Sequence, residues 1–297
     1  MNSVVATPTS TRGNLASYRV SIGDIDVIAV GDGYLALDPA ALPAAKAEEV
    51  RPLLDDACLP AGLVRTYING FVVEAGGKRI LIDAGLGRGA VDTAGHLAAN
   101  LAASGIAPET IDLILLTHLH RDHVRGITDE AGKAVFPNAA VMLHERDLAF
   151  WTDEAEESRA PPFAKQYFGI ARAALTPYTG RIDTFSKAGE IIGGVSAVPA
   201  AGHTPGHTMY RVVSGNSSLL IAGDIVHLPA LQFPRPDWSI VLDVDPQAAA
   251  DTRCRVLDAA VADGEMLTGM HFSFPGFGHV RKAGQGYRVV PALWEAQ

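Results

Sequence analysis

The N-terminal part of the chain alternates apolar and polar residues in a way that predicts paired β-strands. Residues 18–30 alternate around Gly23-Asp24, which predicts a hairpin. Residues 64–74 and 78–83 are also strand-like and flank Gly76-Gly77, a pair that tolerates positive φ in a turn. We therefore expect two antiparallel hairpins before the middle of the chain.

Helical spacing of apolar residues appears next, between shorter strand-like runs. Residues 96–103, 144–151 and 163–175 are predicted helices, and residues 111–116 and 139–143 are predicted strands. This alternation is typical of βαβ units. Residues 39–59 are rich in alanine, proline and glutamate, which is compatible with a short helix or with a flap, and their role stays open.

Strands return in the C-terminal half and are followed by one long helix. Residues 195–199, 208–213 and 218–222 read as strands, and residues 246–262 as a helix. The order of strands, helices, strands, helix and strand predicts an α/β (α+β) protein in which mixed sheets face each other with helices outside. Without repeats or linkers, residues 16–297 are expected to form a single domain after a mobile segment, residues 1–15.

Composition narrows the class of protein. The chain has 297 residues, 48% hydrophobic and 19% charged, as in an ordinary soluble globule. Its formal charge of −9 and the lack of a basic block argue against a nucleic-acid partner. Two cysteines, Cys58 and Cys254, are too few for a disulfide framework. With no signal peptide and no membrane span evident, we expect a cytoplasmic protein without a membrane partner.

The candidate chemistry is concentrated in the segment THLHRDH, residues 117–123, directly after an apolar predicted strand. Side chains at i and i+2 of an extended segment point the same way, so His118 and His120 can bind one ion. Asp122 and His123 lie past the bend and can face a second ion. Because burying these side chains without a cation would be costly, the segment predicts a metal site.

Further residues of ligand type follow later strands. His203 begins the motif HTPGH after residues 195–199, Asp224 ends the motif AGD after residues 218–222, and His271 follows another apolar run. Chain leaving the ends of neighbouring strands meets at one edge of a sheet. The three residues are therefore expected to join the histidine segment.

The motifs HLHRDH, GHTPGH and AGD, followed by a late histidine, resemble in order and separation the metallo-β-lactamase-fold hydrolase superfamily. The resemblance implies a four-layer αββα sandwich with two metals at the edge between the sheets. It assigns His118, His120 and His203 to metal 1, Asp122, His123 and His271 to metal 2, and Asp224 to both. It also implies that Asp83, in the segment LIDAG, supports the ligands by hydrogen bonds and is not a ligand itself.

The C-terminal segments HFSFPGFGH and GYRVVP are similar to the methyl parathion hydrolase group of that superfamily. This similarity implies hydrolysis of lactones, aryl esters or phosphotriesters, commonly by homodimers. Trp151 and Phe168 match aromatic positions that face the substrate in that group. With Phe233 and Ile240 they would give an apolar pocket that favours small, uncharged esters.

Other histidines and Arg121 receive separate expectations. His207, the second histidine of GHTPGH, is expected to support the ligands or bond to backbone. His96, His144 and His279 have no partner spacing and are expected to be structural or surface residues. His227 stands where acyl-homoserine lactonases, otherwise similar, have a tyrosine, so it either donates a hydrogen bond to the substrate or lines the pocket. Arg121 is expected to face solvent.

The expected reaction is metal-dependent hydrolysis. Nitrogen and carboxylate ligands suit two zinc ions, and they also suit manganese, iron or cobalt. A hydroxide that bridges the ions would be the nucleophile, with Asp224 exchanging its proton and Asp122 holding the second ion. A dedicated acyl-homoserine lactonase, which would act in quorum quenching, is the alternative. A nuclease of the same fold conflicts with the acidic charge, and a thiolate-type β-lactamase would need cysteine at Asp224.

Overall fold

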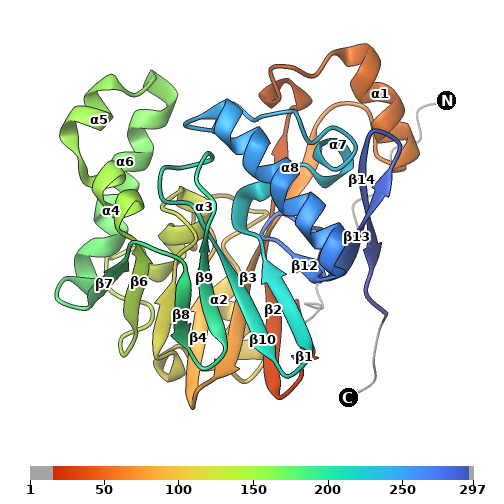
Figure 1. Ribbon diagram of the computed structural model, residues 1–297. Coiled ribbons are helices and arrows are strands. Elements are labelled where there is room, and N and C mark those ends of the chain that lie inside the picture. Colours follow the sequence, from red (N-terminus) through yellow and green to blue (C-terminus); the bar gives the residue numbers. More distant parts are fainter. Residues whose placement is uncertain (1–15, 294–297) are drawn as a thin grey trace.

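The computed structural model describes residues 16–293, in which two seven-stranded mixed sheets face each other (Figure 1). The predicted mobile segment, residues 1–15, lies outside the described residues. The first sheet begins with antiparallel strands and continues with parallel ones. Its order is β1 (Ser17–Ile22), β2 (Ile25–Leu37), β3 (Val64–Ala75), β4 (Lys78–Ile82), β5 (Leu113–Leu115), β6 (Ala140–His144) and β7 (Ile182–Phe185).

The second sheet is built mainly from antiparallel pairs, and β11 and β12 form its parallel pair. Its order is β14 (Gly286–Pro291), β13 (Gly278–Ala283), β12 (Met266–Thr268), β11 (Ser217–Ile221), β10 (Thr208–Ser214), β9 (Val195–Pro199) and β8 (Gly189–Ile192). Both predicted N-terminal hairpins are confirmed, as β1–β2 and β3–β4.

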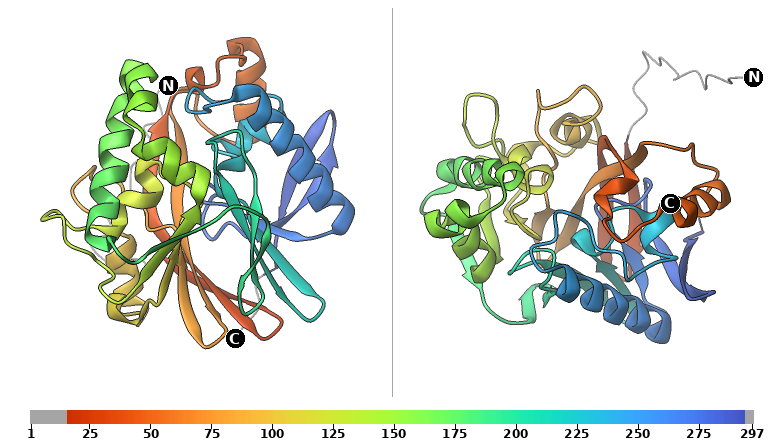
Figure 2. Two further views of the ribbon diagram at one scale, coloured as in Figure 1. Left: turned by 60° about the vertical axis from the view of Figure 1, so that its left-hand side comes forward. Right: turned by 90° about the horizontal axis from the view of Figure 1, so that it is seen from above.

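Helices cover the outer face of each sheet (Figure 2). The larger α-helices are α1 (Ala47–Asp56), α2 (Leu97–Ala103), α4 (Glu145–Thr152), α5 (Glu154–Arg159), α6 (Pro162–Leu175) and α8 (Pro246–Asp263). Single turns are α3 (Arg121–Val124), α7 (Pro229–Gln232), η1 (Pro39–Ala41), η2 (Pro108–Thr110), η3 (Arg125–Ile127), η4 (Thr176–Tyr178) and η5 (Gly223–Ile225). Helices α2, α4 and α6 pack on the first sheet, and α8 packs on the second.

The alternation that predicted β2 also explains the layers. Val27 and Ala29 point into the core between the two sheets, whereas Ile28 and Val30 point into the core under the helices of the first sheet. Successive residues of a strand face opposite sides, so one strand supplies two hydrophobic layers. Together with the core under α8, this arrangement confirms the predicted αββα sandwich.

Several elements were not predicted, among them the hairpin of β13 and β14 and the short elements β7, β8 and α5. Strands β7 and β8 lie at the edges of their sheets and have no buried residue, and α5 has none either. Residues 39–59, for which the sequence left a helix or a flap open, contain η1 and α1. Helix α1 packs with α7 through Val50, Leu54 and Leu231. No helix among residues 16–293 is long and apolar enough to cross a membrane.

Candidate metal centre

The histidine segment leaves β5 as extended chain and then turns into α3. His120 keeps extended angles, φ −68° and ψ 154°, and the helical turn begins at Arg121. Asp83 fixes the start of the segment, because its carboxylate accepts from the Thr117 backbone N–H at 2.8 Å and hydroxyl at 2.7 Å. The change from strand to helix at His120 separates the pair His118 and His120 from the pair Asp122 and His123, as the sequence predicted.

One group of donor atoms gathers around His118, His120 and His203. The Nε2 atom of His118 lies 3.0 Å from Nδ1 of His120, which lies 2.9 Å from Nε2 of His203. The Oδ2 atom of Asp224 is 3.6 Å from His118 Nε2 and 3.3 Å from His203 Nε2. These four side chains are buried, and their donor atoms all lie within 4.8 Å of one another. They form the first candidate ligand set.

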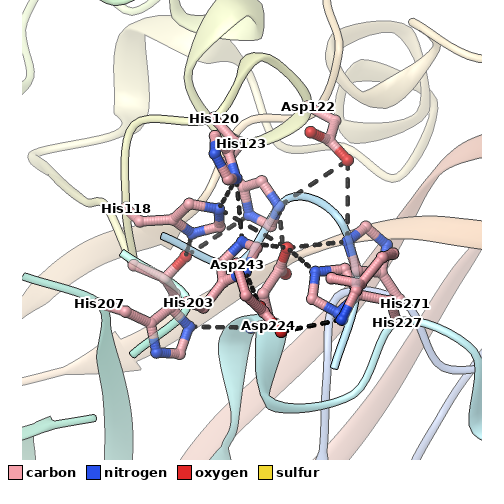
Figure 3. Close-up of polar contacts among 12 residues, drawn as sticks. His118, His120, Asp122, His123, His203, His207, Asp224, His227, Asp243 and His271 are labelled. Carbon is pink, nitrogen blue, oxygen red and sulfur yellow. Dashed lines mark hydrogen bonds and ion pairs between the residues drawn. The ribbon is translucent and has the colours of Figure 1, made fainter. Parts of the chain in front are cut away.

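A second group adjoins it across Asp224, which lies in the middle of the cluster (Figure 3). The Oδ1 atom of Asp224 is 3.2 Å from His123 Nε2, and Oδ2 is 3.1 Å from His271 Nε2. Asp122 approaches from the other side, with Oδ2 at 3.7 Å from His271 Nε2 and 3.9 Å from His123 Nε2. The structure thus brings together all seven residues that the sequence proposed as ligands.

The histidines are oriented by acceptors behind them. The Nδ1 atom lies 2.6 Å from Asp83 Oδ2 in His123, and 2.7 Å from the Tyr67 carbonyl oxygen in His271. A carbonyl can only accept, so Nδ1 of His271 carries the proton and Nε2 presents its lone pair to the centre. His203 is held in the same way, with Nδ1 2.7 Å from Asp243 Oδ1. Such partners fix ring orientation and increase ligand basicity.

His207 is excluded as a ligand by its hydrogen bonds. Its Nδ1 donates to the Ala200 carbonyl oxygen at 3.1 Å, and its Nε2 accepts the Asp224 backbone N–H at 2.9 Å. Burial lowers the pKa of His207 to about 3, so the ring is neutral and both nitrogens are used. Its position therefore matches the expected supporting role, because it holds the backbone of Asp224.

His227 lies inside the cluster. Its Nε2 is 3.1 Å from Asp224 Oδ2, and its ring stacks on that of His271 at a centroid distance of 5.3 Å. Desolvation lowers the pKa of His227 to about 4, in spite of the attraction of Asp224, so its ring is neutral. Among the described residues, its Nδ1 has no hydrogen-bond partner. In the part of the chain that the structure describes, His96, His144 and His279 belong to no candidate ligand group.

The electrostatics of the cluster fit a cation. Burial alone would lower the pKa of His123 and raise that of Asp224, but each group holds the other in its charged form. The pKa of His123 therefore lies well above its ordinary value, and that of Asp224 well below. Within residues 16–293, the buried His123 Nε2 and Asp224 Oδ1 have no hydrogen-bond partner. Nitrogen and carboxylate donors left in this way suit divalent metals.

A pocket of about 170 Å³ opens onto the centre. Its walls include Leu35, Leu37 and Val241, and His227 and Ile240 also line it, as predicted. Arg121 lines this pocket too and is only partly exposed, so the expectation that it simply faces solvent is not met. Arg121 is the first residue of α3, directly after the candidate ligand His120, and this place brings it to the pocket.

The aromatic residues proposed for the pocket are divided between two other places. Trp151 and Phe168 line an adjoining compartment of about 300 Å³, and the Trp151 ring also contacts that of His120 at a centroid distance of 5.1 Å. Phe233 does not line either space. It packs against Phe272 in the core under α8, because α7 turns it away from the centre.

Sequence reasoning missed three residues near the centre. Asp243 orients His203 from a loop that carries no motif. Asp147 in α4 accepts the backbone N–H of Leu119 at 2.8 Å and so fixes the histidine segment. Tyr167 in α6 lines both the pocket and the adjoining compartment. The only signal for Tyr167 was its place beside Phe168 on a predicted helix.

Comparison with known sequences gives one family model, described as the metallo-beta-lactamase superfamily, which matches residues 63–271. An uncharacterized protein of Bacillus subtilis, YobT, is 30% identical over 161 residues, or 54% of this chain and 63% of that protein. Ribonuclease TTHA0252 of Thermus thermophilus is 28% identical over 195 residues, 63% of this chain and 42% of the ribonuclease. The matches thus span less than two thirds of the length of these relatives.

Two solved structures are similar over nearly the whole chain. AbOPH, a hydrolase in the beta lactamase superfamily, is 34% identical, with a TM-score of 0.89 and coverage of 96% of this chain and 100% of that one. AidC, a dizinc quorum-quenching lactonase in complex with a product, is 24% identical, with a TM-score of 0.89 and coverage of 95% and 99%. At this identity the second likeness concerns the fold.

Proposed function

The chain belongs to the metallo-β-lactamase superfamily, and on this premise we propose that it is a dinuclear metal-dependent hydrolase of esters. Its proposed substrates carry an uncharged reacting group, most readily a lactone or an aryl ester. We place phosphotriesters of the methyl parathion type among them, because the C-terminal motifs resemble that group. We further propose that residues 16–297 form one domain and that the protein acts as a homodimer in the cytoplasm.

The observation that carries this proposal is the convergence of seven ligand-type side chains beside a pocket with apolar walls. Four of them leave the first sheet after β5, and three leave the second sheet after β9, β11 and β12. A protein of this fold that only binds or assembles would not need a ligand-type side chain at all seven of these positions. AbOPH, with 34% identity over nearly the whole chain, supports hydrolysis as the reaction class.

We assign His118, His120 and His203 to one ion and Asp122, His123 and His271 to the other, with Asp224 shared. Zinc is the proposed metal, and manganese, iron or cobalt are compatible with the same donors. When bound, such ions supply Lewis acidity toward a carbonyl or phosphoryl oxygen and lower the pKa of a coordinated water.

The residues of the chain position the reaction. In ester hydrolysis, water adds to the carbonyl carbon, the bond to the leaving oxygen breaks, and a carboxylic acid and an alcohol result. Asp224 is placed to take a proton from the attacking water at Oδ2 and to return it to the leaving oxygen. The neutral ring of His227, 3.1 Å from that oxygen, can donate a hydrogen bond to the reacting carbonyl. The aliphatic walls offer apolar surface to the uncharged part of a substrate.

The experiment that tests this function combines metal analysis with a substrate panel. Purified protein should contain two divalent ions per chain and hydrolyse lactones, aryl esters and a phosphotriester, but not a cephalosporin or RNA. His120→Ala and Asp224→Ala should lose both metal and activity. Full activity and normal metal content in either variant would rule the dinuclear model out.

A dedicated acyl-homoserine lactonase is the second candidate, and one observation favours it. The compartment of about 300 Å³ lined by Trp151, Phe163 and Phe168 adjoins the catalytic pocket and has the apolar walls that an acyl chain requires. A steep increase in kcat/KM with acyl-chain length, restricted to homoserine lactones, would favour this candidate over a general esterase.

A further inference from the structure

Arg121 brings a permanent positive charge to the catalytic pocket. Among the residues that line this pocket it is the only arginine or lysine. The other walls are aliphatic or aromatic or belong to the candidate centre, apart from Thr66, whose hydroxyl donates to the His227 carbonyl oxygen. The deep residues His227, Ile240 and His271 are buried, whereas Arg121 and Tyr167 are partly exposed. These two residues therefore lie at the rim of the pocket.

The guanidinium of Arg121 makes no ion pair or hydrogen bond with the described residues. Within residues 16–293, no carboxylate lies within ion-pair distance of it, although many other arginines are paired, such as Arg79 with Glu74 at 2.6 Å and Arg211 with Glu265 at 2.8 Å. The neighbouring Asp122 turns its carboxylate toward His123 and His271. The charge of Arg121 is thus available at the pocket rim.

Tyr167 faces the same space from α6. Its ring lies against that of His120, with centroids 5.6 Å apart, and it lines both the catalytic pocket and the adjoining compartment. Tyr167 therefore shares the catalytic pocket with Arg121, and within residues 16–293 its hydroxyl has no hydrogen-bond partner.

The guanidinium of Arg121 and the hydroxyl of Tyr167 can both donate hydrogen bonds to an anionic oxygen. A guanidinium presents parallel N–H groups that match the two oxygens of a carboxylate, and a tyrosine hydroxyl can donate one further hydrogen bond. The candidate centre adds to this preference, because two divalent ions carry more charge than Asp122 and Asp224 neutralise. A negative group at the rim would be attracted by both, while the reacting ester remains uncharged.

We propose that Arg121 and Tyr167 form a carboxylate-binding subsite, and that the preferred substrates are esters or lactones with a carboxylate on the part of the molecule that is not cleaved. This inference rests on the proposed function and narrows its substrate class. Arg121 and Tyr167 determine specificity, since they hold the substrate through a group remote from the broken bond.

The test uses three p-nitrophenyl esters that differ only at the far end of a six-carbon acyl chain: the hexanoate, the monoester of adipic acid, and its carboxamide analogue. With metal-loaded wild-type protein we expect kcat/KM for the carboxylate ester to exceed that for the hexanoate about tenfold, mainly through KM, the size of one partly exposed charged hydrogen bond. Arg121→Gln should abolish this preference, and Tyr167→Phe should reduce it.

Arg255→Gln is the matched control, because it removes the same charge from the exposed side of α8 and should keep the wild-type preference. An equal ratio of carboxylate to hexanoate rates in wild type and Arg121→Gln would overturn the proposal. The proposal would also be overturned if Arg121→Gln lowered kcat/KM for the carboxamide ester as much as for the carboxylate ester, because recognition would then need only a neutral oxygen. Melting curves should show that each variant is folded.

A binding measurement separates this inference from the proposed function. The anilides of adipic and hexanoic acid are not readily hydrolysed, so calorimetry can compare their affinities for the metal-loaded protein. We expect the adipic monoanilide to bind more tightly in wild type and equally in Arg121→Gln. If none of the esters is hydrolysed but this difference appears, the function proposal fails and the subsite stands. Equal affinities in wild type would overturn the subsite.

Discussion

The Nδ1 atom of His203 lies 2.7 Å from Oδ1 of Asp243, a residue that no motif in the sequence marks. Asp243 is itself held, since its Oδ2 accepts the backbone N–H of Ile240 at 2.9 Å and lies 3.9 Å from the buried guanidinium of Arg253. The orientation of one candidate ligand therefore depends on a loop and on α8, outside the histidine segments.

Replacing Asp243 should weaken metal binding without removing a ligand. We expect Asp243→Ala to lower zinc affinity about 10–100-fold, because His203 loses the acceptor that fixes its ring and basicity. Titration against a chelating indicator measures this change. Asp243→Asn keeps one acceptor oxygen and should lose less. An affinity unchanged in Asp243→Ala would show that His203 is oriented by other contacts.

A substitution of His227 should lower the catalytic rate without changing metal binding. In His227→Phe the ring volume is retained but the hydrogen-bond donor is lost, so we expect kcat to fall about 10²-fold or more, as when an oxyanion donor is removed. Metal content, measured by mass spectrometry, should stay at the wild-type value. Loss of one ion would instead identify His227 as a ligand, since it also lies in a candidate group with Asp224 and His271.

Removal of the metal should cost more stability at alkaline pH. Burial lowers the pKa of His203, but the hydrogen-bonded carboxylates of Asp224 and Asp243 outweigh it and raise the pKa to about 9. Protonated His203 therefore stabilises the metal-free fold below pH 6.5, its ordinary pKa, and this contribution is lost as the pH rises to about 9. Metal binding needs the deprotonated ring and strengthens over the same range.

We accordingly expect the Tm difference between metal-loaded and chelated protein to widen from pH 6.5 to about pH 9. Differential scanning calorimetry in a buffer series measures it. In Asp224→Ala, where the centre cannot be completed, the difference should be small at every pH. A difference in wild type that is constant across this range would contradict the assignment of His203 as a metal ligand.

Gly126 should be intolerant of any side chain. A Cβ atom there would lie 1.8 Å from the Ala84 carbonyl oxygen, where η3 passes under the loop after β4. We expect Gly126→Ala to lower the free energy of unfolding by at least about 2 kcal/mol, since backbone would have to move. Gly169→Ala in α6 is the control, because its Cβ meets nothing within 4 Å. That variant should gain about 0.5–1 kcal/mol. Urea denaturation measures both, and equal effects would contradict the packing argument.

Local patterns predicted the facing mixed sheets and the candidate ligand residues, and the family resemblance added the four layers and the assignment of those residues to two metals. Alternation assigned β2 and β3, and the histidine motifs follow strands whose ends must meet. Strand β7 was missed because an edge strand with exposed Asp183 and Thr184 has no such pattern. Asp243 and Tyr167 were missed for another reason: their roles arise from contacts between segments far apart in the chain.

The division of the candidate ligands between the two sheets also bears on how the chain folds. The first sheet alone offers His118, His120, Asp122 and His123, and the remaining candidate ligands join them only when the second sheet has packed against it. A half-folded chain could therefore hold an ion only weakly. Tight metal binding would therefore require that the two halves of the chain have packed together in the correct register, and it would stabilise only such molecules.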